Sequence, residues 1–191
     1  MKKRKLFAVI AAVGILFAFG ATGFAAGADT KTSEASIEFK AGILELNSVP
    51  ALDFGAHTID GTTTQFPMAD GTPSMQVADA RGNGAGWKVT AALGAFSTTG
   101  GATPIESATI TLGQGTSRAT GTLDTAPTVK QAVTLAANGA SDTVATAAVS
   151  SGRGTWNVDW TAGNIMIDVP IQHQRTGTHT ATLTWTLEDA P

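Results

Sequence analysis

The three histidines are the residues of this sequence best suited to bind a metal ion or to act as a general base. They stand at His57, His173 and His179, and none belongs to an HExxH motif or to a pair with ligand spacing. The chain has no cysteine, so a zinc site would have to collect carboxylates from distant loops. We therefore predict no metal site and no cofactor, and we expect each histidine in a loop or at a strand end, in contact with solvent.

The serines and carboxylates give a catalytic site equally little support. No serine stands in a Gly-x-Ser-x-Gly elbow, and no Asp-x-Asp-x-Asp-Gly spacing marks a calcium loop. A glycosidase needs two carboxylates at a set separation, but nothing marks a pair among Asp53, Asp79, Asp159, Asp168 and Glu188. We predict a protein that is not an enzyme, with no catalytic residue and no small-molecule substrate, and a hydrolase remains an alternative.

The segment Arg81 to Trp87, RGNGAGW, has alternate glycines like those of a phosphate-binding loop. Such a loop is followed by a helix whose N-terminus holds the phosphate, but here the chain continues into the alternating segment WKVTAAL. Alternate glycines ahead of a strand predict a tight turn or a bulge instead. The segment Ser151 to Trp156, SGRGTW, repeats the Gly-x-Gly arrangement before a tryptophan, and we predict that the two loops lie side by side at one end of the sheets.

Tryptophan is the most distinctive residue type, since the chain has four tryptophans and no tyrosine. We favour a structural role for these rings, because burying one removes about 150–250 Å² from water, which is worth several kcal/mol. The alternative is that one or two rings face outward and stack on a glycan or on a partner's side chain. Three of them precede an aliphatic residue on the same face of an expected strand: Trp87 with Val89, Trp156 with Val158, and Trp185 with Leu187. Trp156 and Trp160 are the candidates for the binding role.

The first 28 residues have the three parts of a secretory signal peptide. Lys2 to Lys5 are basic, Leu6 to Phe19 carry no charge, and small residues then lead to Ala28. We predict cleavage before Asp29, with a cut after Ala25 as the near alternative and an uncleaved membrane anchor as the rival interpretation. The chain is expected to be secreted, and to contact the membrane only through this segment before cleavage.

Export changes the charge of the chain. Loss of the four basic residues at its start leaves eight basic residues against fifteen acidic ones, a net charge near −7. This is the wrong sign for a phosphate-binding surface, so we exclude nucleic acid as a partner. The remaining length, about 160 residues, suits one hydrophobic core and one domain.

Short alternating segments separated by Gly, Pro, Asn and Asp fill the rest of the chain. This pattern is typical of an antiparallel sandwich or barrel, and we predict an all-β, antiparallel β-sandwich as a single domain over residues 37–191, after a flexible lead over residues 29–36. The only candidate helix, Ala140 to Gly152, has a Thr, Val and Ser content that favours a strand. The clearest strands are Trp87 to Leu93 and Ala181 to Leu187. Others are expected around residues 37–40, 44–46, 52–54, 75–77, 110–112, 133–135, 156–160 and 165–171, the last at a sheet edge or with a bulge because of Pro170.

Four segments of the chain carry a family resemblance: LNSVPALDFGAHTI, VADARGNGAGW, GWKVTAAL and TATLTWTLEDAP. Together they resemble the WxL domain family, cell-surface proteins of low-GC Gram-positive bacteria with two separated Trp-x-Leu motifs. The resemblance places the proximal motif at Trp87 and Val89, and the C-terminal motif at Trp185 and Leu187. Val89 departs from the family's Leu, and His179 stands where the family usually has Tyr. His179 is therefore a third candidate binding residue, and if that Tyr contributes to binding, its replacement makes binding weaker or dependent on pH.

The resemblance implies a protein of the Gram-positive cell wall and cell surface that is retained without a covalent bond, with peptidoglycan as its target. It also implies partners among other WxL proteins and membrane-anchored envelope proteins. The sequence agrees with non-covalent retention, since it contains no Leu-Pro-x-Thr-Gly sorting signal. We predict peptidoglycan binding, and the alternative is a structural subunit that binds other envelope proteins rather than glycan.

Overall fold

The computed structural model describes residues 29–99, 103–121 and 124–189. The predicted signal peptide, residues 1–28, lies outside the described residues. Residues 29–38 contain neither helix nor strand, and the β-domain begins at Phe39. Within the described part of the chain, no helix is long and apolar enough to cross a membrane.

The β-domain is built from antiparallel sheets, which confirms the all-β prediction. One sheet has the order β1-β3-β11-β7, and its strands all pair antiparallel. A second sheet has the order β14-β4-β10-β8. The strands of these sheets are β1 (Leu44–Ser48), β3 (Ser74–Asp79), β11 (Gly154–Asp159), β7 (Thr116–Thr120), β14 (Leu183–Asp189), β4 (Trp87–Leu93), β10 (Asp142–Ala147) and β8 (Thr128–Val129).

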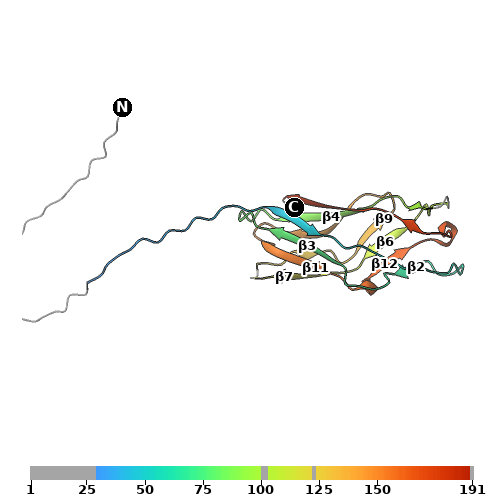
Figure 1. Ribbon diagram of the computed structural model, residues 1–191, viewed down its shortest axis with the longest axis horizontal. Coiled ribbons are helices and arrows are strands. Elements are labelled where there is room, and N and C mark those ends of the chain that lie inside the picture. Colours follow the sequence, from blue (N-terminus) through green and yellow to red (C-terminus); the bar gives the residue numbers. More distant parts are fainter. Residues whose placement is uncertain (1–28, 100–102, 122–123, 190–191) are drawn as a thin grey trace, which may run out of the picture. The chain divides into compact units, whose positions relative to one another are not determined.

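A third sheet, in the order β2-β12-β6-β9, and a two-stranded ribbon of β13 and β5 complete the domain. In Figure 1, β4 runs along one side of the domain, and β3, β11 and β7 run along the other side. Strands β6, β12 and β2 lie towards one end. These elements are β2 (Gln65–Pro67), β12 (Ile165–Asp168), β6 (Thr109–Leu112), β9 (Val133–Ala136), β13 (His179–Thr180), β5 (Ser97–Thr98) and the 3₁₀ turns η1 (Ala162–Asn164) and η2 (Ile171–His173).

The core follows directly from the period-two patterns of the sequence. In β4 every second residue from Trp87 to Leu93 is buried, and in β3 every second residue from Met75 to Asp79 is buried. These two inner faces contribute to one hydrophobic cluster together with Val158 of β11. A sandwich-like arrangement results, in which threonine-rich outer faces cover a single interior.

Three segments differ from the strands expected. Residues 37–40 form no strand, and Ile37 and Phe39 are 78 % and 86 % exposed. Residues 52–54 lie in a loop that packs against the core through Leu52 and Phe54. Of the two alternatives for residues 165–171, the sheet edge is wrong, because β12 lies between β2 and β6. The strand itself is present but ends at Asp168, before Pro170, which has no N–H to donate to a ladder.

Two further predictions are confirmed. The segment from Ala140 to Gly152 contains a strand, β10, rather than a helix. The two glycine loops lie side by side, because the N–H of Ser150 donates to the carbonyl of Gly84 at 2.8 Å. Their contact leaves no room for a side chain at Gly86, where an added Cβ would lie 2.4 Å from the carbonyl oxygen of Ala147. Gly86 also has φ of +81°, a conformation that favours glycine.

Candidate functional site

The two tryptophan motifs, far apart in the sequence, lie on neighbouring strands. Strand β14 pairs with β4 along its whole length, in a register that sets Leu187 opposite Val89 and Asp189 opposite Trp87. The structure therefore joins the proximal and the C-terminal motif into one unit of a sheet. All four motif residues face inward, with Trp87 and Val89 fully buried and Trp185 and Leu187 half-buried.

Trp87 is held both by packing and by a hydrogen bond. Its ring is 0 % exposed, and its Nε1 donates to the carbonyl of Gly152 at 3.0 Å. Gly152 lies close against the indole, because a Cβ there would be 2.8 Å from Trp87 Nε1 and 2.4 Å from the Cβ of Ala147. The second glycine loop thus packs against the Trp87 ring and accepts its hydrogen bond.

Trp185 has a different environment. Its ring lies 6.4 Å from that of Trp160, centroid to centroid, with the planes tilted by 55°. Its Nε1 is buried and has no hydrogen-bond partner among the described residues. A buried donor without an acceptor costs about 1–3 kcal/mol, so Trp185 stabilises the domain through packing alone.

The different environments of Trp87 and Trp185 predict different losses of stability when each is replaced by phenylalanine. Trp87→Phe removes a buried hydrogen bond and leaves the carbonyl of Gly152 without its donor, for an expected loss of roughly 2–4 kcal/mol with the cavity included. Trp185→Phe removes an N–H that has no acceptor, and we expect it to cost less than half as much. Urea unfolding followed by far-UV circular dichroism measures both; equal losses would contradict the assignment of the indole hydrogen bonds.

The rings of Trp156 and Trp160 lie in the interior, only 3 % and 4 % exposed. Each donates its Nε1 proton to a backbone carbonyl at 3.0 Å, that of Arg153 for Trp156 and that of Gly113 for Trp160. Neither ring presents an open face on which a sugar or a side chain stacks. This placement favours the structural interpretation of both residues and gives the binding hypothesis no support.

A buried ion pair fixes the end of the motif unit. The Asp79 side chain is 1 % exposed and Arg81 Nη2 donates to its Oδ2 at 2.8 Å, while Arg81 Nη1 donates to Asp189 at the end of β14. The same guanidinium donates to the carbonyl of Gly86 at 2.7 Å. Asp79 was considered from the sequence only as one of five carboxylates among which no catalytic pair is marked. Its closeness to Arg81 is visible in the sequence, but the contact of Arg81 with β14 is not.

The ion pair changes the pKa of both partners. The hydrogen bonds from the Arg81 side chain hold the pKa of Asp79 below its ordinary value of 3.8, against the opposing effect of burial. The Asp79 carboxylate in turn raises the pKa of Arg81 above its ordinary value. Both groups are therefore charged at neutral pH, and the cluster links β3, the first glycine loop and β14.

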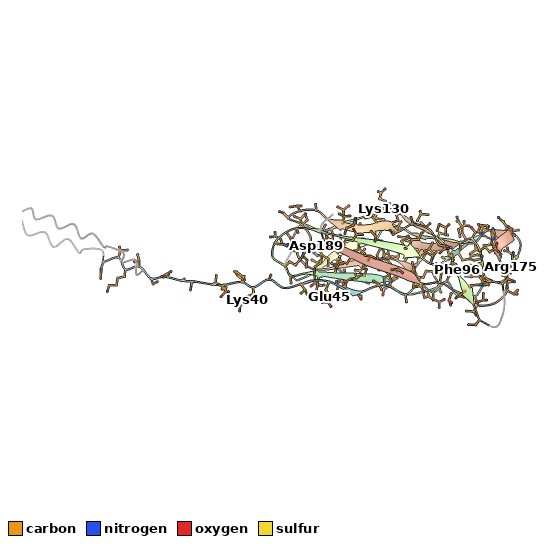
Figure 2. The ribbon with its side chains drawn as sticks, turned by 90° about the horizontal axis from the view of Figure 1, so that it is seen from above. Lys40, Glu45, Phe96, Lys130, Arg175 and Asp189 are labelled. Atoms are coloured by element: carbon orange, nitrogen blue, oxygen red, sulfur yellow. The ribbon has the colours of Figure 1, made fainter. Side chains whose placement is uncertain are left out.

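A groove with a volume of about 510 Å³ lies between two of the sheets. Its base is apolar, with Leu93 and Leu183 from the sheet of β4 and β14, and Ile110 and Ile167 from the sheet of β6 and β12. Figure 2 shows two of the lining residues, Phe96 and Arg175, at the end of the domain opposite to Asp189. The rim comes from two loop segments, residues 52–59 and residues 174–181.

Aromatic and imidazole rings line this groove. The His57 ring packs on Phe66 with centroids 4.5 Å apart and planes tilted by 35°. His57 Nε2 lies 2.6 Å from the carbonyl oxygen of Phe54, which fixes the orientation of the imidazole. Phe54, Phe66 and Phe96 are all half-buried, so each keeps part of its ring open.

His179 lies in the groove wall, in the ribbon strand β13. Its Nε2 is 2.9 Å from the carbonyl oxygen of Arg175, and a carbonyl only accepts, so Nε2 is the donor. Nδ1 is buried and has no hydrogen-bond partner among the described residues. Of the three candidate binding residues, His179 is the one that lies at a concave surface.

Charges of both signs stand on the rim. Arg175 Nη1 donates to the carbonyls of Gln172 and Gln174, at 2.7 Å and 2.8 Å, which leaves other N–H groups of the exposed guanidinium for a ligand. Asp53 accepts a hydrogen bond from the N–H of Gly55 at 2.8 Å. No group of three or more metal-ligating side chains occurs in the described residues. The groove is thus suited to hold a neutral or mixed-charge ligand by ring contacts and hydrogen bonds.

Sequence reasoning did not single out the phenylalanines or Arg175. Phe54, His57 and the rest of one rim belong to the segment LNSVPALDFGAHTI, which carried the family resemblance without any assigned role. Loops have no periodic pattern, so their meeting at one groove is visible only in the folded chain.

An antiparallel β-domain with a concave surface lined by aromatic rings has the features of a ligand-binding domain. Compared with known protein families, residues 27–191 match the WxL domain, described as a surface cell wall-binding domain. The chain belongs to the WxL family. The family description identifies a binding domain of the cell surface whose target is the cell wall. No curated protein and no solved structure matches the chain.

Proposed function

We propose that this protein is secreted, binds peptidoglycan without a covalent bond at the surface of a Gram-positive bacterium, and uses the groove for this contact. The observation that carries the proposal is the set of open rings around a concave surface on a member of a cell wall-binding family. Sites for organic ligands are concave, lined mainly by apolar and aromatic groups, and oriented by a few polar groups.

The chemistry of the groove fits a glycan strand with peptide stems. The apolar face of a sugar ring packs on aromatic rings such as Phe54 and Phe96, and its hydroxyls bond to rim groups such as Asp53. Stem carboxylates are ligands for the guanidinium of Arg175. The acidic surplus of the chain opposes an anionic wall, but salt at physiological concentration screens this repulsion beyond about 8 Å.

The test is a pull-down of the chain from Asp29 onwards with insoluble peptidoglycan. We expect His179→Ala to weaken binding about tenfold, equivalent to ~1.4 kcal/mol, and Phe96→Ala to weaken it similarly. The matched control is His173→Ala, since His173 is half-buried but does not line the groove. Unaltered binding in both groove variants would refute this site, and no enrichment of the parent protein over an unrelated acidic domain would refute the proposed function.

One observation favours the second function, a structural subunit that binds other envelope proteins. Strand β14 stands at the edge of its sheet, and an open edge accepts a strand from a partner. Mixing the protein separately with wall material and with purified envelope proteins distinguishes the two functions, because only a subunit of a protein complex is retained without glycan.

A further inference from the structure

The outer edge of β14 has free backbone hydrogen-bonding groups. The N–H of Gly94 donates to the carbonyl of Thr182 at 2.9 Å, so in this antiparallel ladder the even-numbered residues of β14 bond to β4. The N–H and C=O groups of Leu183, Trp185 and Leu187 therefore point away from β4. No strand of the described residues pairs with them.

This edge lies near β1 of the other sheet, but it has little of the usual protection against pairing. Strand β14 is seven residues long, follows β4 without a register shift, and contains no proline and no lysine. Three other edge strands of the described sheets are blunted: β1 has a bulge near Ser48, β8 has two residues, and β2 ends in Pro67. The apolar side chains of β14 facing the interior are only half-buried.

The segment Ile37 to Ala41, IEFKA, has a strand pattern but pairs with no strand of the described residues. Ile37 and Phe39 lie on one face, 78 % and 86 % exposed, and Glu38 and Lys40 alternate with them. Exposed apolar side chains in succession mark a surface that another surface covers.

We propose that the segment Ile37 to Ala41 of one copy of this chain pairs as an added strand with the outer edge of β14 of a second copy. In an antiparallel register, hydrogen-bonded partners have side chains on the same face of the sheet. Odd-numbered donor residues then place Ile37 and Phe39 beside Trp185 and Leu187.

The other face of the added strand matches equally well. Glu38 and Lys40 fall beside the outward residues of β14, which are Thr184, Thr186 and Glu188. A slip by one residue would put the charged pair against Trp185 and Leu187. The side-chain pattern therefore favours registers in which the odd-numbered residues of the segment lie beside the odd-numbered residues of β14.

The direction of the chain favours a second copy over the chain's own β14. The N–H of Gly42 donates to the carbonyl of Ala80, and the N–H of Ala80 donates to the carbonyl of Ile43, both at 2.9 Å. These bonds continue the ladder of β1 and β3 beyond Leu44, so the chain leaves the sheet along the line of β1. Pairing with its own β14 would require a reversal within Ala41 and Gly42.

A contact between the lead segment of one copy and the edge of the next uses two different surfaces. Such a heterologous contact forms a ring where the rotation between copies closes, and otherwise it builds an open series of copies. Wall binding through the groove would then occur at many points along one assembly.

The first test is light scattering after size exclusion with the chain from Asp29 onwards. We expect the average mass to rise with concentration for the parent protein and to remain that of a monomer for the double variant Ile37→Glu with Phe39→Glu. The matched control is Val149→Glu, which places the same charge at an apolar residue that is 68 % exposed elsewhere. A parent protein that stays monomeric at all concentrations overturns the proposal, and that result includes the case in which the segment folds back on its own chain.

The second test uses a labelled peptide of residues 33–43 and the double variant as acceptor, measured by fluorescence anisotropy. Odd-numbered donor residues direct their N–H groups to β14, so methylation of the backbone nitrogen of Phe39 is expected to reduce binding at least tenfold. Methylation at Lys40 is expected to leave binding unchanged. Equal binding of both methylated peptides, or no binding of the unmodified one, overturns the proposed pairing.

This inference and the proposed function fail separately. The double variant keeps every residue of the groove, so it is expected to retain the affinity of a single copy for peptidoglycan. Loss of assembly with retained wall binding supports both proposals, whereas wall binding by a parent protein that never assembles overturns only the strand pairing.

Discussion

Removal of the last ten residues, Thr182 to Pro191, is expected to yield a chain that does not fold. The deletion removes β14, and with it the whole ladder on one side of β4. Leu183, Trp185 and Leu187 no longer cover the core, and Arg81 loses Asp189. A domain with a total stability of about 5–15 kcal/mol does not tolerate the loss of a complete strand.

Near-UV circular dichroism of the tryptophans and a thermal scan measure this prediction. The expected result is the absence of a cooperative transition at any temperature. The control is Thr184→Ala with Thr186→Ala, which changes two exposed side chains of β14 but keeps the strand. A truncated chain that melts cooperatively near the temperature of the parent protein would show that β14 is dispensable for the core.

Arg81→Met is expected to destabilise the domain by about 3–5 kcal/mol, because it leaves the buried carboxylate of Asp79 without its partner. The matched control is Arg118→Met, since Arg118 pairs with Asp159 at 3.0 Å on the surface, where both side chains are partly exposed. A surface pair of this kind contributes only about 0–1 kcal/mol. Urea unfolding at pH 7 separates the two variants, and equal losses would contradict the role assigned to Asp79.

The pair of Asp79 and Arg81 also determines how the unfolding free energy changes with pH. Arg81 lowers the pKa of Asp79 in the folded protein, so the pair stabilises the fold above the ordinary value of 3.8 and loses this effect as the pH falls below it. In Arg81→Met, burial remains without the cation and raises the pKa of Asp79. We therefore expect the difference in unfolding free energy between the parent protein and the variant to shrink from pH 7 to pH 4. A constant difference over this range would show that Asp79 does not titrate with the pair.

The parts of the fold that follow from local pattern were predictable from the sequence. Alternation in Trp87 to Leu93 determined both the strand and its buried face, because a strand has only two faces. The same alternation in Ile37 to Lys40 gave a wrong strand, since pattern indicates a strand's faces but not the presence of a neighbour to pair with. Glycine marked the loop contact at Gly84, because its φ of +64° favours a residue without a Cβ.

The groove and the ion pair depend on contacts between distant parts of the chain. The groove joins residues 52–59 to residues 174–181, and neither segment has a period that fixes its position. Asp189 reaches Arg81 only because the register of β14 places it opposite Trp87. His179 was a candidate from the sequence because it departs from a family pattern. The burial of Trp156 and Trp160, by contrast, is visible only in the three-dimensional packing.

The pairing of β4 with β14 affects the order of folding. The ribosome makes about ninety further residues between the two strands, so β4 lacks its neighbour β14 during about half of synthesis. Closure of this sheet therefore depends on a contact of long sequence separation, which is slow to form because the loop entropy is lost before the contact stabilises the chain.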